Sequence, residues 1–225
     1  MGALIDFLQV KSKPVRDLAA RRLNKDENRE LALKFDVEYF DGSREQGYGG
    51  YRYDGRWVPV AHRLIEHYNL RPGDRVLDIG CAKGFLVKDL REALPGLDVW
   101  GLDVSGYALR NAVPEAQPYL IQGSCDALPF PDADFKLAIS INTAHNLELD
   151  GCARALREMS RVAPAHGFVQ VDAYRDERER QVFEDWMLTA RTYLTPAGWR
   201  DLFAATGYRG DYFWTILKVD DALRL

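Results

Sequence analysis

Between residues 75 and 174, short apolar runs alternate with stretches of helical periodicity. Together with a run near the end of the chain, the predicted strands span residues 75–80, 97–105, 119–123, 135–142, 167–174 and 211–219. Strands that alternate with helices form βαβ units, in which helices cover both faces of a parallel sheet. We therefore expect an α/β domain whose ligands bind at the carboxyl ends of the strands.

The length of 225 residues suits one large domain better than two. We expect an extension over residues 1–69, helical in its first ~35 residues and aromatic-rich after them, followed by a core over residues 70–225. The net charge of −4 argues against a broad nucleic-acid footprint. The one local exception is the basic segment 11–25, which a solvated helix face explains best.

The three cysteines, Cys81, Cys125 and Cys152, are too widely spaced for a disulfide framework or a paired metal site. They predict a reducing compartment, so we expect a cytoplasmic protein without a bound metal. The first ten residues lack the features of a signal peptide, and no apolar run is long enough to predict a membrane span.

The first predicted strand ends in the sequence VLDIGCAKG, residues 76–84. Asp78 lies inside this apolar run, where an ionised carboxylate is costly unless it has a partner. Gly80 and Gly84 permit a tight turn and a close backbone approach. A structural explanation is that Asp78 caps a loop, whereas the functional explanation is a ligand at this strand end.

The second strand ends in Asp103, 23 residues after Gly80, a distance that suits hydrogen bonds to the hydroxyls of a ribose. A dinucleotide would bring a pyrophosphate, which Asp78 would repel. S-adenosylmethionine carries an ammonium and a sulfonium, which Asp78 would attract. The Gly-x-x-x-Gly spacing also differs from the dinucleotide fingerprint, although Lys83 favours a phosphate.

Four motifs follow one another along the chain: VLDIGCAKG (76–84), GLDVS (101–105), GSCDALPFPDADFKLAIS (123–140) and ALREMSRVAPAHGFVQV (155–171). In this order they resemble the motifs of class I S-adenosylmethionine-dependent methyltransferases over roughly residues 70–219. The family more often has glycine where this chain has Ala82. The resemblance implies a Rossmann-like fold with a mostly parallel seven-stranded sheet and helices on both faces.

The resemblance also implies the residues that bind the cofactor, S-adenosylmethionine. Asp78, Gly80 and Cys81 would lie near its methionine part. Asp103 would hold the ribose, with Val104 near the adenine. The remaining positions flank the adenine and close the methyl side: Cys125, Asp126 and Asn142.

Residues that follow the fourth and fifth strands are candidates for binding or activating a methyl acceptor. His145 is the candidate general base, because histidine titrates near neutral pH; a hydrogen-bonded structural histidine explains it equally well. Asp172, Tyr174 and Arg175 follow the fifth strand, and Arg175 could clamp an anionic group or be an ordinary surface arginine.

The stretch YGGYRYDGRW, residues 48–57, combines four aromatic side chains with three glycines. Tyr48 and Tyr51 offer apolar area with polar tips, and Arg52 is a candidate anion contact. We interpret the stretch as a lid over the cofactor and the substrate; the alternative is that it packs permanently as core.

The sequence thus predicts a methyltransferase that transfers a methyl group to oxygen or nitrogen of a small polar molecule, such as a sugar or a natural-product intermediate. We expect a small-molecule acceptor as partner and neither a membrane nor nucleic acid; the oligomeric state stays open, with a homodimer as one option. Three alternatives also stay open: an RNA or protein methyltransferase, a nicotinamide-dependent oxidoreductase, and a non-catalytic protein that binds an adenosyl ligand.

Overall fold

The computed structural model of the chain describes residues 2–9 and 17–217. Its centre is one parallel sheet in the order β3-β2-β1-β4-β5-β6. The strands are β1 (Arg75–Ile79), β2 (Asp98–Asp103), β3 (Leu120–Gln122), β4 (Leu137–Ile141), β5 (His166–Ala173) and β6 (Asp211–Ile216). The Rossmann-like α/β class is confirmed, and each strand coincides with a run that the apolar pattern predicts, although β5 begins one residue earlier than expected.

The expected count of seven strands is wrong for the described part of the chain, where the sheet has six. The seventh strand came from the resemblance and not from an apolar run. After β5 the chain builds two helices and then β6, which pairs directly with β5 in parallel. The predicted residues 218 and 219 of the last strand lie outside the described residues.

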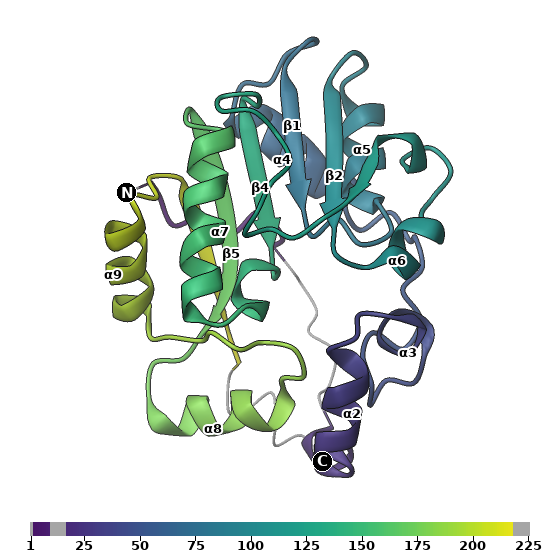
Figure 1. Cartoon of the computed structure of the whole chain (residues 1–225), viewed down its shortest axis with the longest axis vertical. Coiled ribbons are helices and arrows are strands. Elements are labelled where there is room, and N and C mark those ends of the chain that lie inside the picture. The colour runs from purple at the N-terminus through teal and green to yellow at the C-terminus, as the bar shows by residue number, and fades with distance from the viewer. Residues whose placement is uncertain (1, 10–16, 218–225) are drawn as a thin grey trace.

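Helices cover both faces of the sheet (Figure 1). Those of the core are α4 (Val58–His67), α5 (Phe85–Ala93), α6 (Gly106–Arg110), α7 (Leu149–Val162), α8 (Glu177–Trp186) and α9 (Pro196–Thr206). Successive side chains of β1 point to opposite faces of the sheet, because the side chains of a strand alternate with a period of two residues. Val76 packs in the cluster that holds α4 and α5, whereas Leu77 and Ile79 pack in the cluster that holds α7 and α9.

The N-terminal segment is only partly helical. Residues 2–9 are not a helix; instead Leu4 bridges Tyr212, and the Ile5 N–H donates to the Tyr212 carbonyl at 2.9 Å. This pairing covers the start of the outer edge of β6, at Tyr212, which would otherwise present unpaired backbone groups. Three short helices follow: α1 (Leu18–Arg22), α2 (Lys25–Ala32) and α3 (Val37–Asp41).

The carboxyl ends of the strands face this N-terminal segment. In Figure 1 the arrows of β1, β2 and β4 point toward the side of the molecule where α2, α3 and α8 lie. Helix α1 packs against α8, and α3 packs against α6. The fold therefore brings the N-terminal helices to the edge of the sheet where ligands of α/β proteins bind.

Candidate active site

A cavity of about 160 Å³ lies at the carboxyl ends of β1, β2 and β4. We call it cavity 1. Its wall includes Gly80 after β1, Asp103 at the end of β2 and Asn142 after β4. Tyr39 and Phe40 of α3 form the side that faces the N-terminal segment. Cavity 1 is thus built where the sequence motifs predict a cofactor site.

Gly80 lies in this wall where there is no room for a side chain. Its φ is +83°, and a Cβ added there would meet the Thr143 side chain at 1.9 Å. The N–H groups of Gly80 and Cys81 both donate to the Leu102 carbonyl, at 2.7 and 3.1 Å. These bonds hold the turn after β1 against β2, and only glycine fits its conformation without strain.

Asp78 is a buried carboxylic acid two residues before Gly80. It is 5% exposed, and no hydrogen bond or ion pair reaches its carboxylate from the described part of the chain. Burial, and then the neighbouring Asp103 carboxylate, raises the pKa of Asp78 to about 7. A carboxylate in this position favours a positively charged ligand, because such a ligand would offset the cost of ionising it.

We expect Asp78→Asn to change how stability depends on pH. An unfolded aspartate has lost its proton above pH ~4, whereas the folded Asp78 keeps its proton up to about pH 7. Between these pH values the unfolded state releases a proton that the folded wild type keeps, so the free energy of unfolding of the wild type falls as pH rises from ~4 to ~7. The variant should gain on the order of 1 kcal/mol relative to wild type for each pH unit of this window, and no more above pH ~8.

Urea unfolding of the ligand-free protein at several pH values measures this difference. Asp201→Asn, at an exposed acid of α9, is the control, and its free energy of unfolding should differ from that of the wild type by the same amount at every pH. A flat difference for Asp78→Asn as well would show that Asp78 titrates normally.

Asp103 is held in a defined position at the end of β2. Its Oδ2 accepts the Ala82 N–H and its Oδ1 accepts the Ser105 N–H, both at 2.8 Å. Burial raises the pKa of Asp103, and these N–H groups oppose that rise. Val104, which is half exposed, extends the cavity wall beside it. A carboxylate fixed in this way keeps lone pairs for hydroxyl donors of a ligand.

Three predicted cofactor residues do not line cavity 1, and they are Asp78, Cys81 and Asp126. Cys81 is buried in the cluster with α4 and α5 and does not line cavity 1. Asp126 is also absent from the cavity wall, since it pairs with Arg154 of α7 at 2.7 Å and accepts a hydrogen bond from Ser124. Cys125, the residue before Asp126, does line the cavity.

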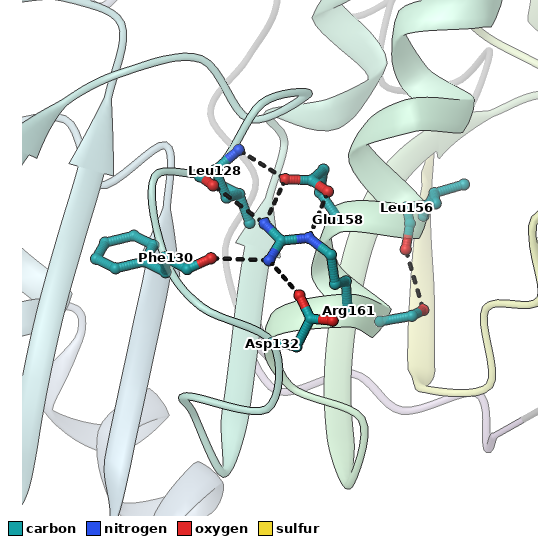
Figure 2. Close-up of polar contacts among 7 residues, drawn as sticks. Leu128, Phe130, Asp132, Leu156, Glu158 and Arg161 are labelled. Atoms are coloured by element: carbon teal, nitrogen blue, oxygen red, sulfur yellow. Dashed lines mark hydrogen bonds and ion pairs between the residues drawn. The ribbon is translucent and has the colours of Figure 1, made fainter.

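The loop after β3 is fixed to α7 by Arg161 (Figure 2). The guanidinium makes a fork to Glu158, at 2.7 Å for each bond, and donates to the carbonyls of Leu128 and Phe130. It also pairs with Asp132 at 2.8 Å. This planar donor set anchors the loop that brings Cys125 to cavity 1.

Lys83, which at the level of the sequence favoured a phosphate ligand, forms an ion pair with Asp41. Its Nζ lies 2.6 Å from Asp41 Oδ2, and the Tyr107 hydroxyl donates to the same oxygen at 2.7 Å. The contact ties α3 to the turn before α5 and to α6. Lys83 therefore serves to hold the N-terminal segment on the core, which removes the feature that favoured a dinucleotide.

The aromatic stretch 48–57 divides into two parts. Tyr48 lines cavity 1. Tyr51 stacks on Phe85 with ring centroids 4.8 Å apart, and the Tyr53 hydroxyl donates to Asp89 at 2.6 Å. Arg52 is exposed and does not line cavity 1. The later part is thus packed on α5, and Tyr48 is the member of the stretch that reaches the cavity.

A second cavity of about 310 Å³ adjoins the first, and we call it cavity 2. Tyr39, Tyr48 and Asn142 line both cavities. Asn142 has a φ of +55°, and its N–H donates to the Gln170 carbonyl at 2.9 Å. A molecule in cavity 2 would therefore lie next to a molecule in cavity 1, with these three side chains between them.

His145 lines cavity 2, but its ring is engaged by Asp172. The Asp172 N–H donates to Nδ1 at 3.1 Å, and Nε2 lies 3.6 Å from Asp172 Oδ2. An imidazole that accepts at Nδ1 carries its proton on Nε2. Burial lowers the pKa of His145, against the effect of Asp172. This geometry favours a structural histidine over a general base.

Of the three predicted substrate residues at the end of β5 and just after it, one lines a cavity and two do not. Asp172 lines cavity 2, whereas Tyr174 and Arg175 line neither cavity. Arg175 makes a fork to Glu179, with Nε at 2.9 Å from Oε1, which engages the guanidinium at the surface. The predicted substrate contacts at a cavity wall are thus Tyr48 and Asp172.

The residues of cavity 2 that sequence reasoning missed include Arg21, Arg44 and Trp186. Arg21 belongs to the basic segment 11–25, of which residues 11–16 lie outside the described residues. In the described part, Arg21 is buried and Arg22 pairs with Asp185. The sequence of this segment does not show which of its basic residues is buried.

Residues 2–9 and 17–217 contain no cluster of acidic, histidine and cysteine side chains with the geometry of a metal site. None of the helices in these ranges is long and apolar enough to cross a membrane.

Comparison with known proteins identifies the domain. A family model described as a methyltransferase domain matches residues 76–167. Uncharacterized protein MJ1252 of Methanocaldococcus jannaschii is 32% identical over 117 residues, which cover 51% of this chain and 43% of that protein. Demethylmenaquinone methyltransferase of Symbiobacterium thermophilum is 34% identical over 90 residues, 36% of each chain. The matched region thus spans less than half of either relative.

Among solved structures, the YcgJ protein of Bacillus subtilis superposes with a TM-score of 0.52 and 22% identity, covering 65% of this chain and 66% of that one. At this identity the likeness shows a shared fold. The family match, the strand order and the cavity at the strand ends agree: residues 76–167 match a methyltransferase domain, and the sheet has the Rossmann-like fold of the solved methyltransferase structures.

Proposed function

We propose that this chain is an S-adenosylmethionine-dependent methyltransferase that acts on oxygen or nitrogen of a small polar molecule. The observation that carries the proposal is the pair of adjoining cavities at the strand ends, which share Tyr39, Tyr48 and Asn142. Transfer of a methyl group needs donor and acceptor aligned in line and protected from water. Two cavities with a common wall provide that arrangement.

The residues in and beside cavity 1 fit the cofactor. Asp78, two residues before Gly80 of the cavity wall, is a buried acid without a described partner, which suits the ammonium of the methionine part. Asp103 is fixed by two backbone donors and suits the ribose hydroxyls. When bound, S-adenosylmethionine supplies a methyl group on a positively charged sulfur. The chain's own residues would orient the two molecules, with Tyr39 and Tyr48 closing the site.

The extension 1–69 has a part in this proposal as the cover of both cavities. Its helix α3 contributes Tyr39 and Phe40 to cavity 1, and the Asp41–Lys83 ion pair fixes that helix to the core. Residues 70–225 would form the cofactor-binding core. The aromatic stretch would act as a lid through Tyr48, since its later part is packed on α5.

Calorimetric titration tests the cofactor, and an acceptor screen tests the reaction. We expect micromolar binding of S-adenosylmethionine and S-adenosylhomocysteine and no binding of NAD. Formation of S-adenosylhomocysteine with members of a small-molecule panel, followed by mass spectrometry, tests transfer. NAD binding without adenosyl binding would refute the proposal. Adenosyl binding with no turnover on any acceptor class would support the non-catalytic alternative.

A further inference from the structure

Two arginines from separate parts of the N-terminal segment meet at one aromatic ring in cavity 2. Arg21 comes from α1 and Arg44 from the loop after α3. Their guanidinium carbons lie 4.3 and 5.6 Å from the centroid of the Trp186 ring. Two cations are thus brought together in the wall of the same cavity.

Arg21 is buried, and within residues 2–9 and 17–217 it has no ionic partner. It is 4% exposed, and among these residues it donates one hydrogen bond, from Nη1 to the Glu45 carbonyl at 2.9 Å. No carboxylate of the described residues lies within ion-pair distance of its guanidinium. Burying a cation without a counter-ion is costly, and a guanidinium has five N–H donors to satisfy.

The surrounding charges increase this cost. Burial, and then the Arg44 guanidinium, lowers the pKa of Arg21 to about 10, whereas Glu45 acts in the opposite direction. The Glu45 side chain is exposed. Arg44 itself donates to the carbonyls of Gly47 and Tyr48, each at 3.1 Å, which directs it toward the same cavity wall.

We propose that Arg21 and Arg44 form an anion subsite in cavity 2 that binds a carboxylate or phosphate group of the methyl acceptor. The identity of the bound molecule as the methyl acceptor rests on the function proposed above. Arginine suits this task, because its planar donors match both kinds of oxyanion. An anion there would also supply the negative counter-charge that the described residues do not give the buried Arg21.

The remaining wall of cavity 2 defines the rest of the acceptor. Asn142 lines this cavity and also cavity 1, and its side-chain amide can both donate and accept a hydrogen bond. The acceptor class is therefore a small molecule with two functions. Its anionic group lies at the arginines, and its hydroxyl or amine lies at the wall shared with the cofactor cavity.

A pair of probes that differ only in charge tests the subsite. We would titrate 4-hydroxybenzoate and 4-hydroxybenzamide into the full chain saturated with S-adenosylhomocysteine, with 4-hydroxyphenyl phosphate as a third probe. The variants are Arg21→Gln and Arg44→Gln. Arg22→Gln is the matched control, because Arg22 is the next residue of α1, is exposed and does not line cavity 2.

For the wild type and for Arg22→Gln, we expect one of the anionic probes to bind at least about tenfold more tightly than the amide. Arg21→Gln and Arg44→Gln should each remove most of this preference. The better anionic probe distinguishes a carboxylate from a phosphate. Arg44 is exposed, so its variant keeps the test valid even if Arg21→Gln folds poorly.

Equal or undetectable binding of all three probes to the wild type would overturn the subsite, as would a charge preference that survives both substitutions. The failure of the proposed function looks different. A wild type that discriminates the probes in the absence of cofactor, yet binds no S-adenosylmethionine, would refute the methyl-transfer proposal and leave the anion subsite in place.

Discussion

Asp103→Asn is expected to weaken S-adenosylmethionine binding about 100-fold, which corresponds to about 3 kcal/mol. The substitution removes the charge and turns one acceptor oxygen into a donor. That donor would face the N–H of Ala82 or of Ser105, each of which now donates to the carboxylate at 2.8 Å. Hydrogen bonds to a charged group contribute about 1.5–3 kcal/mol each, so losing the ribose contacts accounts for most of the effect.

Asp126→Asn is the matched control for this prediction. Asp126 also follows a strand of the same edge, but it pairs with Arg154 outside cavity 1. Its substitution should leave cofactor affinity within about threefold of wild type, because surface ion pairs contribute only ~0–1 kcal/mol. Calorimetry measures both variants, and circular dichroism confirms that they are folded. Equal losses in the two variants would show that Asp103 has no special position.

The parts of the fold and site that the sequence predicted depend on local pattern. Apolar runs and helical spacing located the six strands, and a glycine or polar residue at the end of a strand marks the edge of the sheet. Gly80, Asp103 and Asn142 all line cavity 1 for this reason. Their positions follow from the direction of the chain in a parallel sheet.

The parts that the sequence missed depend on partners distant in the chain. Asp126 faces Arg154 of α7, and its side chain follows that partner instead of the cavity. Lys83 meets Asp41, 42 residues earlier in the chain. Arg21 is buried because α1 packs against α8, which no pattern within the segment 11–25 reveals. The pattern of residues along the chain therefore could not predict the direction in which these charged side chains point.

The seventh strand illustrates a different source of error. The residue pattern contained six strand signals, and the structure describes six strands. The additional strand was carried over from a family resemblance with no run in the sequence to support it. The resemblance thus named residues that line cavity 1, where the motifs match, and gave one strand too many, where no motif was available.

Gly80→Ala is expected to abolish measurable cofactor binding and to destabilise the protein by about 3 kcal/mol or more. The added Cβ would lie 1.9 Å from Thr143 Oγ1 and 2.5 Å from its Cγ2, so Thr143 would be displaced at the wall of cavity 1. The positive φ adds a conformational cost of ~1–2 kcal/mol. Thermal unfolding and calorimetry measure the two effects.

Gly207→Ala separates the steric effect from the backbone effect. Gly207 has a similar φ of +72° but no atom within 4 Å of an added Cβ, so it should lose only ~1 kcal/mol and leave cofactor binding unchanged. The double variant Gly80→Ala/Thr143→Ala removes the two shortest contacts and should recover part of both losses. If it recovers neither, the close approach of Thr143 is not what requires glycine at position 80, and the constraint lies in the turn between β1 and α5 itself.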